Sequence, residues 1–292
     1  MLDGWWDVVG CPYCRSALQS TNNVERPIGC LSCGERFAVA GGIPVLLRHQ
    51  DADRLAGFSR SYREERLREG RLPLSVEQAQ ALPYGQPPGF PSLYWEVRRQ
   101  SFCALMRWLA REGPSPTGGP AADLGGGIGW LGYRLAQLRF RVLAVDANRD
   151  EAFGLEAART YYGSLASLLP IQGDLEHPPL QAGRLSLIVC NASLHYASDL
   201  ESTLQRVADA LRPGGHMVIL DTPIARHPRP GTGRGDRHLG RQELHSALLD
   251  AGLRPRRMAV QRGWRWRMHQ VKALLRGDAR FSFPMIVAER TL

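Results

Sequence analysis

The sequence predicts a doubly wound α/β fold, in which helices cover both faces of a mostly parallel sheet, together with a small N-terminal metal-binding segment. Three observations support this prediction. Apolar runs of strand length alternate with amphipathic helical stretches between residues 121 and 251, the order expected of βα units. A glycine-rich turn follows the first of these runs, and two Cys-x-x-Cys pairs lie near the start of the chain.

The glycine-rich turn reads Asp-Leu-Gly-Gly-Gly-Ile-Gly over residues 123–129, after the apolar pair Ala121-Ala122. Such a strand-to-helix turn lets the backbone approach a ligand and directs free helix amides toward it. Asp146 ends the next apolar run, 141–146, and lies 19 positions after Gly127. A carboxylate near that offset can accept hydrogen bonds from both ribose hydroxyls, so the two features predict a nucleotide-type cofactor.

The remaining elements follow in the order of a doubly wound sheet. Residues 168–172 form an apolar run that precedes Gly173-Asp174, and residues 185–191 form a near-continuous one. Such runs are typical of parallel strands that are buried on both faces. Helices are predicted at 200–211 and 241–251, and a strand at 216–221, from their apolar spacing.

These motifs together resemble the class I S-adenosylmethionine-dependent methyltransferases of the type 11 branch, over about residues 95–255. The resemblance rests on the glycine turn, Asp146, Gly173-Asp174 and the run Leu211-Arg-Pro-Gly-Gly215. It implies a Rossmann-like sheet, with Asp146 binding the ribose and Asp174 lying near the adenine. The cofactor-binding residues expected are Asp123, Gly125, Gly127, Asp146, Asp174 and Asn191.

Other interpretations of these residues are open. Asp123 and Asp174 could be turn residues, and Gly214-Gly215 could only end a helix. A nicotinamide dehydrogenase is less favoured, because its Gly-x-Gly-x-x-Gly pattern needs a glycine where Trp130 stands.

The N-terminal segment carries four cysteines, Cys11, Cys14, Cys30 and Cys33, as two Cys-x-x-Cys pairs. This spacing predicts a tetrahedral zinc site that has no open ligand position and is therefore structural. Two disulfides are the alternative. Residues 37–47 are predicted to form two short strands joined by a turn at Gly41-Gly42. The segment resembles the zinc-ribbon partner subunits that activate RNA and protein methyltransferases, and more loosely the ribosomal RNA guanine methyltransferases with an N-terminal zinc site.

We expect three parts: a zinc ribbon at 1–48, a linker or lid at 49–94, and a methyltransferase domain at 95–292 that ends in a basic extension. The linker is predicted to be helical at 60–71 and to cross the mouth of the cofactor pocket. Its aromatic residues either line an acceptor pocket or pack the linker onto the domain. They are Tyr84, Phe90, Tyr94 and Trp95.

The formal net charge of +9 is uneven, because residues 225–292 hold 15 Lys and Arg against 5 Asp and Glu. Arginine alternates with tryptophan at 262–267, and further arginines lie at 254–257. Such a combination can pair phosphates and stack bases, which makes a nucleic-acid surface one interpretation. A clamp for an acidic small molecule, or a solvated face without function, is the other. Lys272 is the sole lysine among 37 basic residues, so genome composition also contributes.

The chemistry is expected beside the strand at 185–191, because ligands of open α/β sheets bind at the carboxyl ends of strands. His195 is the candidate base, or else it packs the following helix, while Asn191 and Tyr196 would orient the acceptor. Further candidates for acceptor contact are Asp221, Arg237 and His238, whereas Cys103 and Cys190 are expected to be buried apolar residues.

The sequence thus predicts a methyltransferase that uses S-adenosylmethionine and a structural Zn²⁺. A small-molecule acceptor, such as a secondary metabolite or a quinone-like compound, is favoured, and a ribosomal or transfer RNA base is the alternative. A scaffold that binds cofactor or partner without turnover is a further one. The ribbon could dock a protein partner. No apolar stretch approaches 18 residues, so no membrane span is expected, and a cytoplasmic location is expected.

Overall fold

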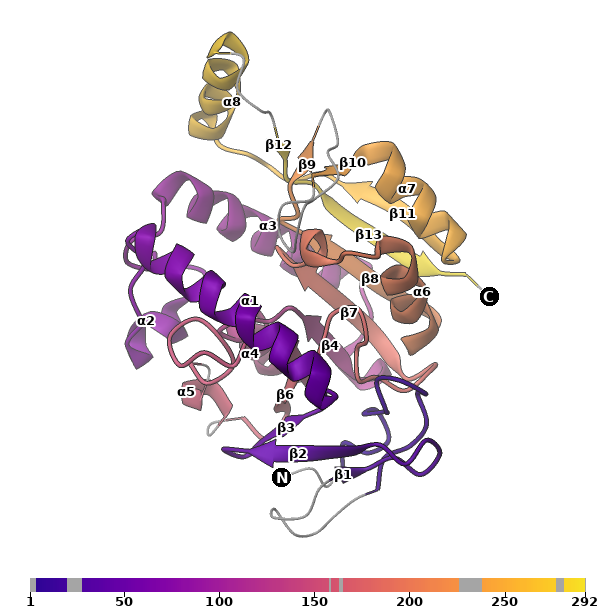
Figure 1. The fold of residues 1–292 in the computed structure, drawn as a ribbon. Coiled ribbons are helices and arrows are strands. Elements are labelled where there is room, and N and C mark those ends of the chain that lie inside the picture. Colours follow the sequence, from indigo (N-terminus) through magenta and orange to yellow (C-terminus); the bar gives the residue numbers. More distant parts are fainter. Residues whose placement is uncertain are drawn as a thin grey trace.

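The computed structural model describes residues 4–19, 28–157, 159–162, 165–225, 238–276 and 281–291, and in this part a ten-stranded sheet forms the centre (Figure 1). The strands lie in the order β1-β2-β3-β6-β5-β4-β7-β8-β13-β11. Their bounds are β1 Ile28–Gly29, β2 Arg36–Ala40, β3 Ile43–Val45, β4 Ala121–Leu124, β5 Val142–Asp146, β6 Leu168–Gln172, β7 Leu185–Asn191, β8 Leu211–Leu220, β11 Leu253–Met258 and β13 Met285–Arg290. A second sheet joins β10 (Leu239–Gly240), β9 (Ile224–Ala225) and β12 (Phe281–Ser282).

The helices of the described chain alternate with these strands. They are α1 His49–Arg68, α2 Val76–Ala81, α3 Ser92–Arg111, α4 Trp130–Gln137, α5 Arg159–Tyr162, α6 Leu200–Ala210, α7 Arg241–Asp250 and α8 Trp264–Arg276, with short 3₁₀ turns at Pro116–Gly118 and Leu194–Tyr196. None of the described helices combines the length and the apolar character that crossing a bilayer requires.

The centre of the sheet is parallel, because β3, β6, β5, β4, β7 and β8 pair in the same direction. Asp123 on β4, for example, lies between Ala144 of β5 and Val189 of β7. The antiparallel strands β13 and β11 close one edge, and β1 and β2 close the other. The carboxyl ends of the parallel strands therefore meet at one edge, and the predicted doubly wound, Rossmann-like sheet is confirmed.

Both faces of the sheet are buried, and alternate residues of each strand enter different cores. On β7, Leu187 and Val189 pack with α3 and α4, whereas Ile188 and Cys190 pack with α6, α7 and the N-terminal segment. This two-sided burial explains why the run at 185–191 is apolar without alternation. Cys190 is fully buried as predicted, but Cys103 on α3 is only partly buried.

The cysteine-rich segment joins the central sheet directly. Val45 of β3 pairs in parallel with Gln172 of β6, and Gly10 donates a backbone hydrogen bond to the Pro179 carbonyl at 3.1 Å. The predicted turn at Gly41-Gly42 is present, and both glycines have positive φ values of 59° and 79°. The strands of this segment thus extend the central sheet and share one of its cores.

Two features of the chain differ from the expected boundaries. The helix predicted at 60–71 is part of α1, which begins at His49 and ends at Arg68. The strand expected at 216–221 begins at Leu211 in the form of β8, with a register shift opposite Leu185 and Leu187. The Pro-Gly-Gly run at 213–215 therefore lies inside β8, where it interrupts the pairing with β7. It does more than end the helix that precedes the strand.

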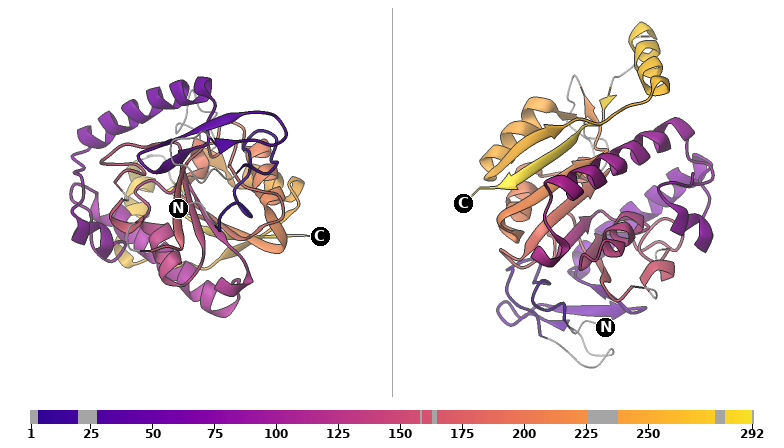
Figure 2. Two further views of the ribbon diagram at one scale, coloured as in Figure 1. Left: turned by 90° about the horizontal axis from the view of Figure 1, so that it is seen from below. Right: turned by 180° about the vertical axis from the view of Figure 1, so that it is seen from behind.

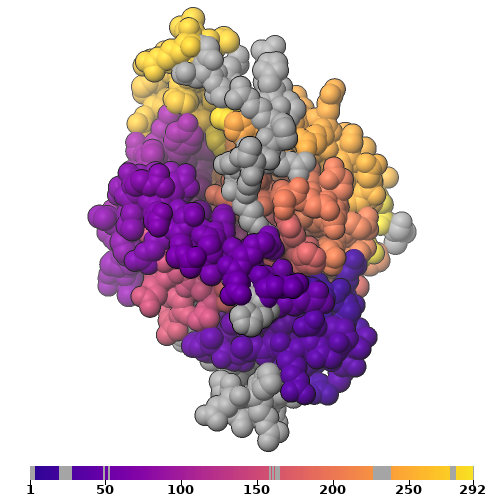
Figure 3. Space-filling model, viewed as in Figure 1, coloured from indigo at the N-terminus to yellow at the C-terminus, as the bar shows by residue number. Residues whose placement is uncertain are grey.

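Two of the long helices stand out in space. Helix α1 crosses in front of the sheet, and α8 projects from the body at the end opposite the ribbon (Figures 1 and 2). Trp266 and Ala273 are the buried side chains of α8, whereas Trp264 and Leu275 are 74% and 81% exposed. The space-filling view shows α1 as a ridge across the front of the molecule (Figure 3).

Candidate active site and metal site

A cavity of about 670 Å³ lies where the carboxyl ends of β4, β5, β7 and β8 meet, and this is the place where open α/β sheets bind ligands. Its walls come from four parts of the chain: the glycine turn, the strand ends, α1, and the segment from Arg71 to Arg98. Its volume falls in the ordinary range of small-molecule sites. The cavity therefore has room for a ligand of nucleoside size beside a smaller one.

The glycine turn forms one wall through backbone geometry that needs glycine. Gly125 and Gly127 have φ values of 75° and 53°, in the left-handed region. A Cβ atom on Gly125 would lie 2.2 Å from the Cβ of Ser193, whereas a Cβ on Gly127 would meet no protein atom within 4 Å. Gly125 thus permits close packing against the residues that follow β7, and Gly127, which lines the cavity, leaves open space beside it.

Asp146 ties the end of β5 to this turn. Its Oδ2 accepts a hydrogen bond from the backbone amide of Gly127 at 2.7 Å, and its Oδ1 accepts one from Asn148 at 2.7 Å. Burial raises the pKa of the Asp146 carboxyl, and the nearby negative charge of Asp174 adds to the effect. Asp146 lines the cavity at the position expected of a ribose-binding acid.

Asp123 holds the start of α4. Its Oδ2 accepts a hydrogen bond from the backbone amide of Gly132 at 2.9 Å. Burial raises the pKa of the Asp123 carboxyl to about 7. Its Oδ1 lies in the cavity wall without a hydrogen-bond partner among the described residues, so one acceptor remains available to a bound ligand.

Asp174 is placed differently from the other expected cofactor residues. Its carboxylate does not line the cavity, and instead Oδ2 forms an ion pair with Arg54 of α1 at 3.1 Å. Its Oδ1 accepts a hydrogen bond from the Glu176 amide at 3.1 Å. The neighbouring Leu175 lines the cavity. An adenine contact at this corner would therefore involve Leu175, while Asp174 anchors α1 over the strand ends.

The strand ends of β7 and β8 bring the expected chemical groups together. Asn191, His195, Tyr196 and Asp221 all line the cavity. Ala192 and Asp221 have positive φ values of 53° and 50°, which is uncommon for residues with a side chain and typical of functional sites. The backbone is thus bent at the two strand ends that face the cavity.

His195 is neutral near pH 7 in this setting. Burial, together with the positive charges of Arg98, Arg66 and His238, lowers the pKa of its imidazole from 6.5 to about 4. Its Nδ1 has no hydrogen-bond partner among the described residues. A neutral ring with a free nitrogen can accept a hydrogen bond or a proton from a ligand. His238 lies within electrostatic range of this ring, whereas Arg237 falls outside the described residues.

The remaining wall of the cavity is aromatic. It is formed by side chains from α1 and by two of the four linker aromatics that were expected to line an acceptor pocket. Phe90 and Trp95 line the cavity, but Tyr84 is 61% exposed and Tyr94 packs against Trp266 with 5.8 Å between ring centroids. The interpretation of Tyr84 and Tyr94 as pocket residues is therefore wrong, because their side chains pack onto the outside of α3 and α8.

Sequence reasoning missed a set of residues that face the cavity from α1 and α3. Phe58 and Tyr62 of α1 contact Tyr196 at ring-centroid distances of 5.7 and 6.4 Å. Four arginines also line the cavity: Arg66, Arg68, Arg71 and Arg98. The i, i+4 spacing of 58, 62 and 66 was a usable signal, because it places these residues on one helix face.

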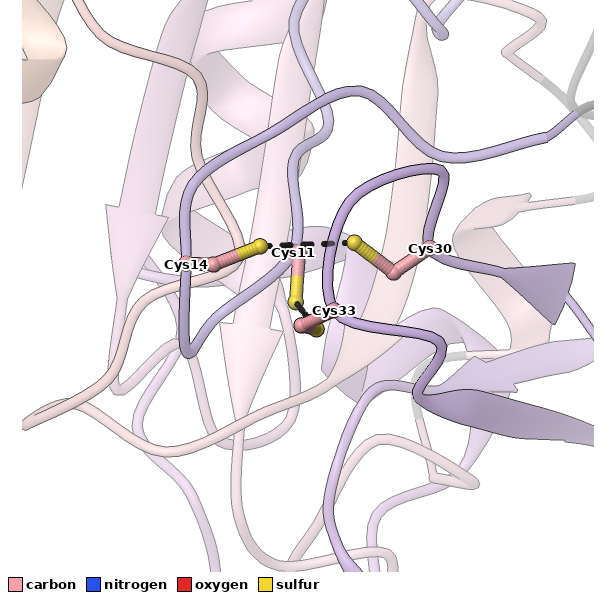
Figure 4. Close-up of side chains that lie close together, drawn as sticks. All are labelled: Cys11, Cys14, Cys30 and Cys33. Carbon is pink, nitrogen blue, oxygen red and sulfur yellow. Dashed lines mark hydrogen bonds between the residues drawn. The ribbon is translucent and has the colours of Figure 1, made fainter.

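The four cysteines of the ribbon converge on one point (Figure 4). All four sulfur atoms lie within 4.8 Å of one another, and the Cys14–Cys30 and Cys11–Cys33 pairs are 3.3 and 3.7 Å apart. A tetrahedron with Zn–S bonds of about 2.3 Å has edges of about 3.8 Å, so the arrangement fits a four-thiolate zinc site. The cysteines are free of disulfides, and the described ribbon offers no open ligand position. The site is therefore structural.

The arginine- and tryptophan-rich stretch does not form a continuous exposed surface. Arg262 donates hydrogen bonds to the Val97 carbonyl at 2.6 Å and to Ser101 Oγ at 2.9 Å, and Trp266 is 8% exposed. Arg262 thus joins α3 to the segment before β13, and Trp266 packs α8 against α3. The interpretation of 262–267 as one nucleic-acid surface is wrong for these two residues, because both are needed inside the fold.

Comparison with known proteins agrees with this geometry. Residues 122–219 match the family model described as "Methyltransferase domain". The chain is 27% identical over 196 residues to the malonyl-[acyl-carrier protein] O-methyltransferase of Enterobacter lignolyticus, covering 63% of this chain and 71% of that protein. It is also 23% identical over 194 residues to squalestatin tetraketide synthase clz2 of Cochliobolus lunatus, but spans only 7% of that protein's length.

Solved structures share the fold. Geranyl diphosphate C-methyltransferase from Streptomyces coelicolor, in complex with Mg²⁺, geranyl diphosphate and S-adenosyl-L-homocysteine, superposes with a TM-score of 0.52 at 19% identity, over 66% of this chain and 80% of that chain. A chain in the complex of the Haloferax volcanii Trm112 methyltransferase activator with a methyltransferase superposes with a TM-score of 0.50 at 18% identity, over 68% and 95% of the two chains.

The fold and the cavity define a class I Rossmann-like methyltransferase architecture. The matched domain then identifies residues 122–219 as the core of an S-adenosylmethionine-dependent methyltransferase, an enzyme, as the sequence motifs predicted. S-adenosylmethionine is the cofactor of this class, and the cysteine cluster adds a site that fits structural zinc.

Proposed function

We propose that this protein transfers the methyl group of S-adenosylmethionine to a small-molecule acceptor, such as a secondary metabolite or a quinone-like compound. One observation carries the proposal: the cofactor cavity continues into a space walled by Phe58, Tyr62, Phe90 and Trp95, under the cover of α1. A cavity with aromatic walls suits a compact organic molecule, whereas a nucleic acid generally needs an extended basic groove.

The cofactor would lie along the strand ends in this proposal. The open space at Gly127 would admit the cofactor atoms that lie against the backbone of the glycine turn, and Asp146 would accept hydrogen bonds from the ribose of the cofactor. The free Oδ1 of Asp123 and the orphaned Oδ1 of Asn191 offer further acceptors to its amino group or to the acceptor molecule. When bound, the cofactor supplies an electrophilic methyl group on a sulfonium.

The chain's own residues would then hold the acceptor in line with that methyl group. Alignment in a closed, water-poor cavity supplies much of the rate in such a displacement. Tyr196 and Asn191 would orient the acceptor, and the neutral His195 would accept a hydrogen bond or the released proton at its free Nδ1. In this proposal His195 is a weak base, because positive neighbours disfavour its protonated form.

An RNA base acceptor is the second candidate. The net charge of residues 225–292 favours it, together with exposed basic side chains on α8 such as Arg267 and Lys272. A protein partner could dock on the ribbon. We further propose the division into a ribbon at 1–48, a covering segment at 49–94 and a catalytic domain at 95–292.

The test is transfer of radiolabelled methyl from S-adenosylmethionine into an extract of the source organism that lacks this gene. The extract is separated into small-molecule and RNA fractions, and the Asp146→Ala variant serves as the matched control. Label in the small-molecule fraction that requires Asp146 supports the proposal. Label in RNA would overturn it in favour of the second candidate.

A further inference from the structure

We propose that the acceptor carries an anionic oxygen group, a carboxylate or a phosphate, which binds a cluster of three of the four arginines in the cavity wall, Arg66, Arg71 and Arg98. The inference rests on the proposed methyl transfer to a small molecule and deepens it by naming the class of acceptor. It follows from where these side chains lie and from the partners they have.

The three arginines come from separate parts of the covering structure. Arg66 lies in the last turn of α1, Arg71 follows that helix, and Arg98 lies on α3. The ring of Phe90 brings two of them together, because the guanidinium carbons of Arg71 and Arg98 lie 4.3 and 5.0 Å from its centroid. Two cations on one aromatic ring repel each other, so an anion between or beside them would relieve the repulsion.

Ion pairs account for two arginines of the cluster but not for Arg98. Arg66 pairs with Glu65 at 2.9 Å and with Glu69 at 3.1 Å, and Arg71 pairs with the same Glu69 at 2.7 Å. Arg98 forms contacts with aromatic rings but has no hydrogen bond or ion pair within the described parts of the chain. Two glutamates thus serve two arginines, and the guanidinium of Arg98 keeps its donors free for a ligand.

Arg98 also lies close to the reacting end of the cavity. Its charge acts on His195, Tyr196 and Asp221, which are the polar groups at the ends of β7 and β8. Asp221 is the nearby acid, but its Oδ1 already accepts a hydrogen bond from Ser101 at 2.5 Å. Arg98 lines the same cavity as His195, Tyr196 and Asp221, so its guanidinium and the polar groups at the strand ends border one space.

The guanidinium geometry selects the class of ligand. A guanidinium that stacks on aromatic faces keeps its planar N–H edges free, and these edges match the two oxygens of a carboxylate or phosphate. The aromatic residues that support the arginines would hold the apolar part of the same molecule. A molecule with an acidic head group and an apolar body would match both the arginines and the aromatic side chains of the cavity.

The test uses the full-length, zinc-containing protein loaded with S-adenosylhomocysteine. Sodium malonate and inorganic diphosphate are titrated separately by calorimetry at low ionic strength without divalent cations. The variants are Arg98→Gln, Arg71→Gln and Arg98→Lys. The lysine variant keeps the positive charge but loses the paired N–H donors of the guanidinium. The matched control is Arg99→Gln, at the next position of α3, where the side chain is exposed and outside the cavity.

We expect at least one probe to bind the loaded protein. Arg98→Gln should weaken that binding about tenfold or more, Arg71→Gln and Arg98→Lys should weaken it less, and Arg99→Gln should leave it within about twofold. Tighter malonate binding would assign a carboxylate, and tighter diphosphate binding would assign a phosphate. S-adenosylhomocysteine affinity should stay the same in all four variants, which shows that they fold.

Three results would overturn the inference: no binding of either probe to the loaded protein, equal binding by Arg98→Gln and Arg99→Gln, or Arg98-dependent binding of a short RNA oligonucleotide in place of both probes. Failure of the proposed function looks different, since the wild-type protein would then not bind S-adenosylhomocysteine or would transfer label only to RNA.

Discussion

The carboxylate of Asp146 accepts a hydrogen bond from the backbone amide of Gly127, with 2.7 Å between oxygen and nitrogen. This contact joins the end of β5 to the glycine turn that follows β4, so the two parts expected to hold the cofactor are fixed relative to each other. The same carboxylate is buried and faces the cavity. It therefore organises the site before any ligand binds.

Replacing Asp146 with Ala should nearly abolish cofactor binding. The change removes the acceptor for two ribose hydroxyls, and two hydrogen bonds to a charged group correspond to about a hundredfold or more in affinity. Isothermal titration with S-adenosylhomocysteine measures this loss, and Glu151→Ala, an exposed acid in the same loop, is the control. Unchanged affinity in Asp146→Ala would show that the cofactor binds elsewhere.

Gly125 of the turn and Gly183, in the loop before β7, should respond differently to alanine. Gly125→Ala places a Cβ 2.2 Å from that of Ser193 in a left-handed conformation, so the free energy of unfolding should fall by roughly 3 kcal/mol. Gly183→Ala has the same backbone strain with no atom within 4 Å and should lose about 1 kcal/mol. Denaturant unfolding measures both, and equal losses would contradict the role assigned to Ser193.

Gly127→Ala should instead act on the cofactor. Its Cβ meets no protein atom within 4 Å, so the protein should fold with a loss of about 1 kcal/mol, from backbone strain alone. The methyl group would occupy the space toward the cavity, and S-adenosylhomocysteine should bind about tenfold more weakly or worse. A variant with wild-type affinity would place the cofactor away from this turn.

The parts of the site that the sequence predicted are those fixed by local spacing. The glycine turn, Asp146 and the two Cys-x-x-Cys pairs each sit within one strand–turn or loop unit, so their geometry follows from short-range pattern. The arginines at 66, 71 and 98 belong to three segments that meet only through tertiary packing on Phe90. The helical spacing of 58, 62 and 66 could place Arg66 on the inner face of α1, but no spacing rule connects Arg66 to Arg71 and Arg98, so the cluster itself could not be predicted.

The same reason accounts for the residues whose roles differ. Asp174 follows β6 as the motif requires, but Arg54, which lies far away in the sequence, forms an ion pair with its carboxylate. Arg262 belongs to a basic run, yet the fold uses its guanidinium to join α3 to the segment before β13. A charge pattern shows that a side chain is basic, but whether it faces solvent depends on neighbours that the pattern does not contain.

The cysteine cluster should hold one zinc ion per chain. Cys14→Ser should lose the metal, measured by elemental analysis of the purified protein, while Cys103→Ser should keep it. Because the ribbon shares a core with the sheet, removal of zinc by a chelator should lower the melting temperature by about 5 °C or more. A metal-free protein with unchanged melting temperature, or two disulfides by mass, would contradict the structural zinc site.

The last prediction concerns the pH dependence that His195 imposes. Its folded-state pKa is about 4, against 6.5 for an unperturbed imidazole, so between these two values the unfolded chain binds a proton that the folded protein does not. The contribution of the neutral ring to the free energy of unfolding is therefore fully present above about pH 6.5, and it is lost as the pH falls toward 4. The groups that face the ring are Arg98, Arg66 and His238, and all favour the neutral form.

Unfolding free energies measured from pH 7 to pH 4.5 should therefore fall less steeply in His195→Gln than in the wild type. His245→Gln, on the exposed face of α7, should keep the wild-type slope. Nuclear magnetic resonance should find the His195 ring uncharged at pH 6. An imidazole that titrates near 6.5 would mean that the ring is not buried beside the arginines as the structure has it, and His195 would then be a stronger base than the geometry implies.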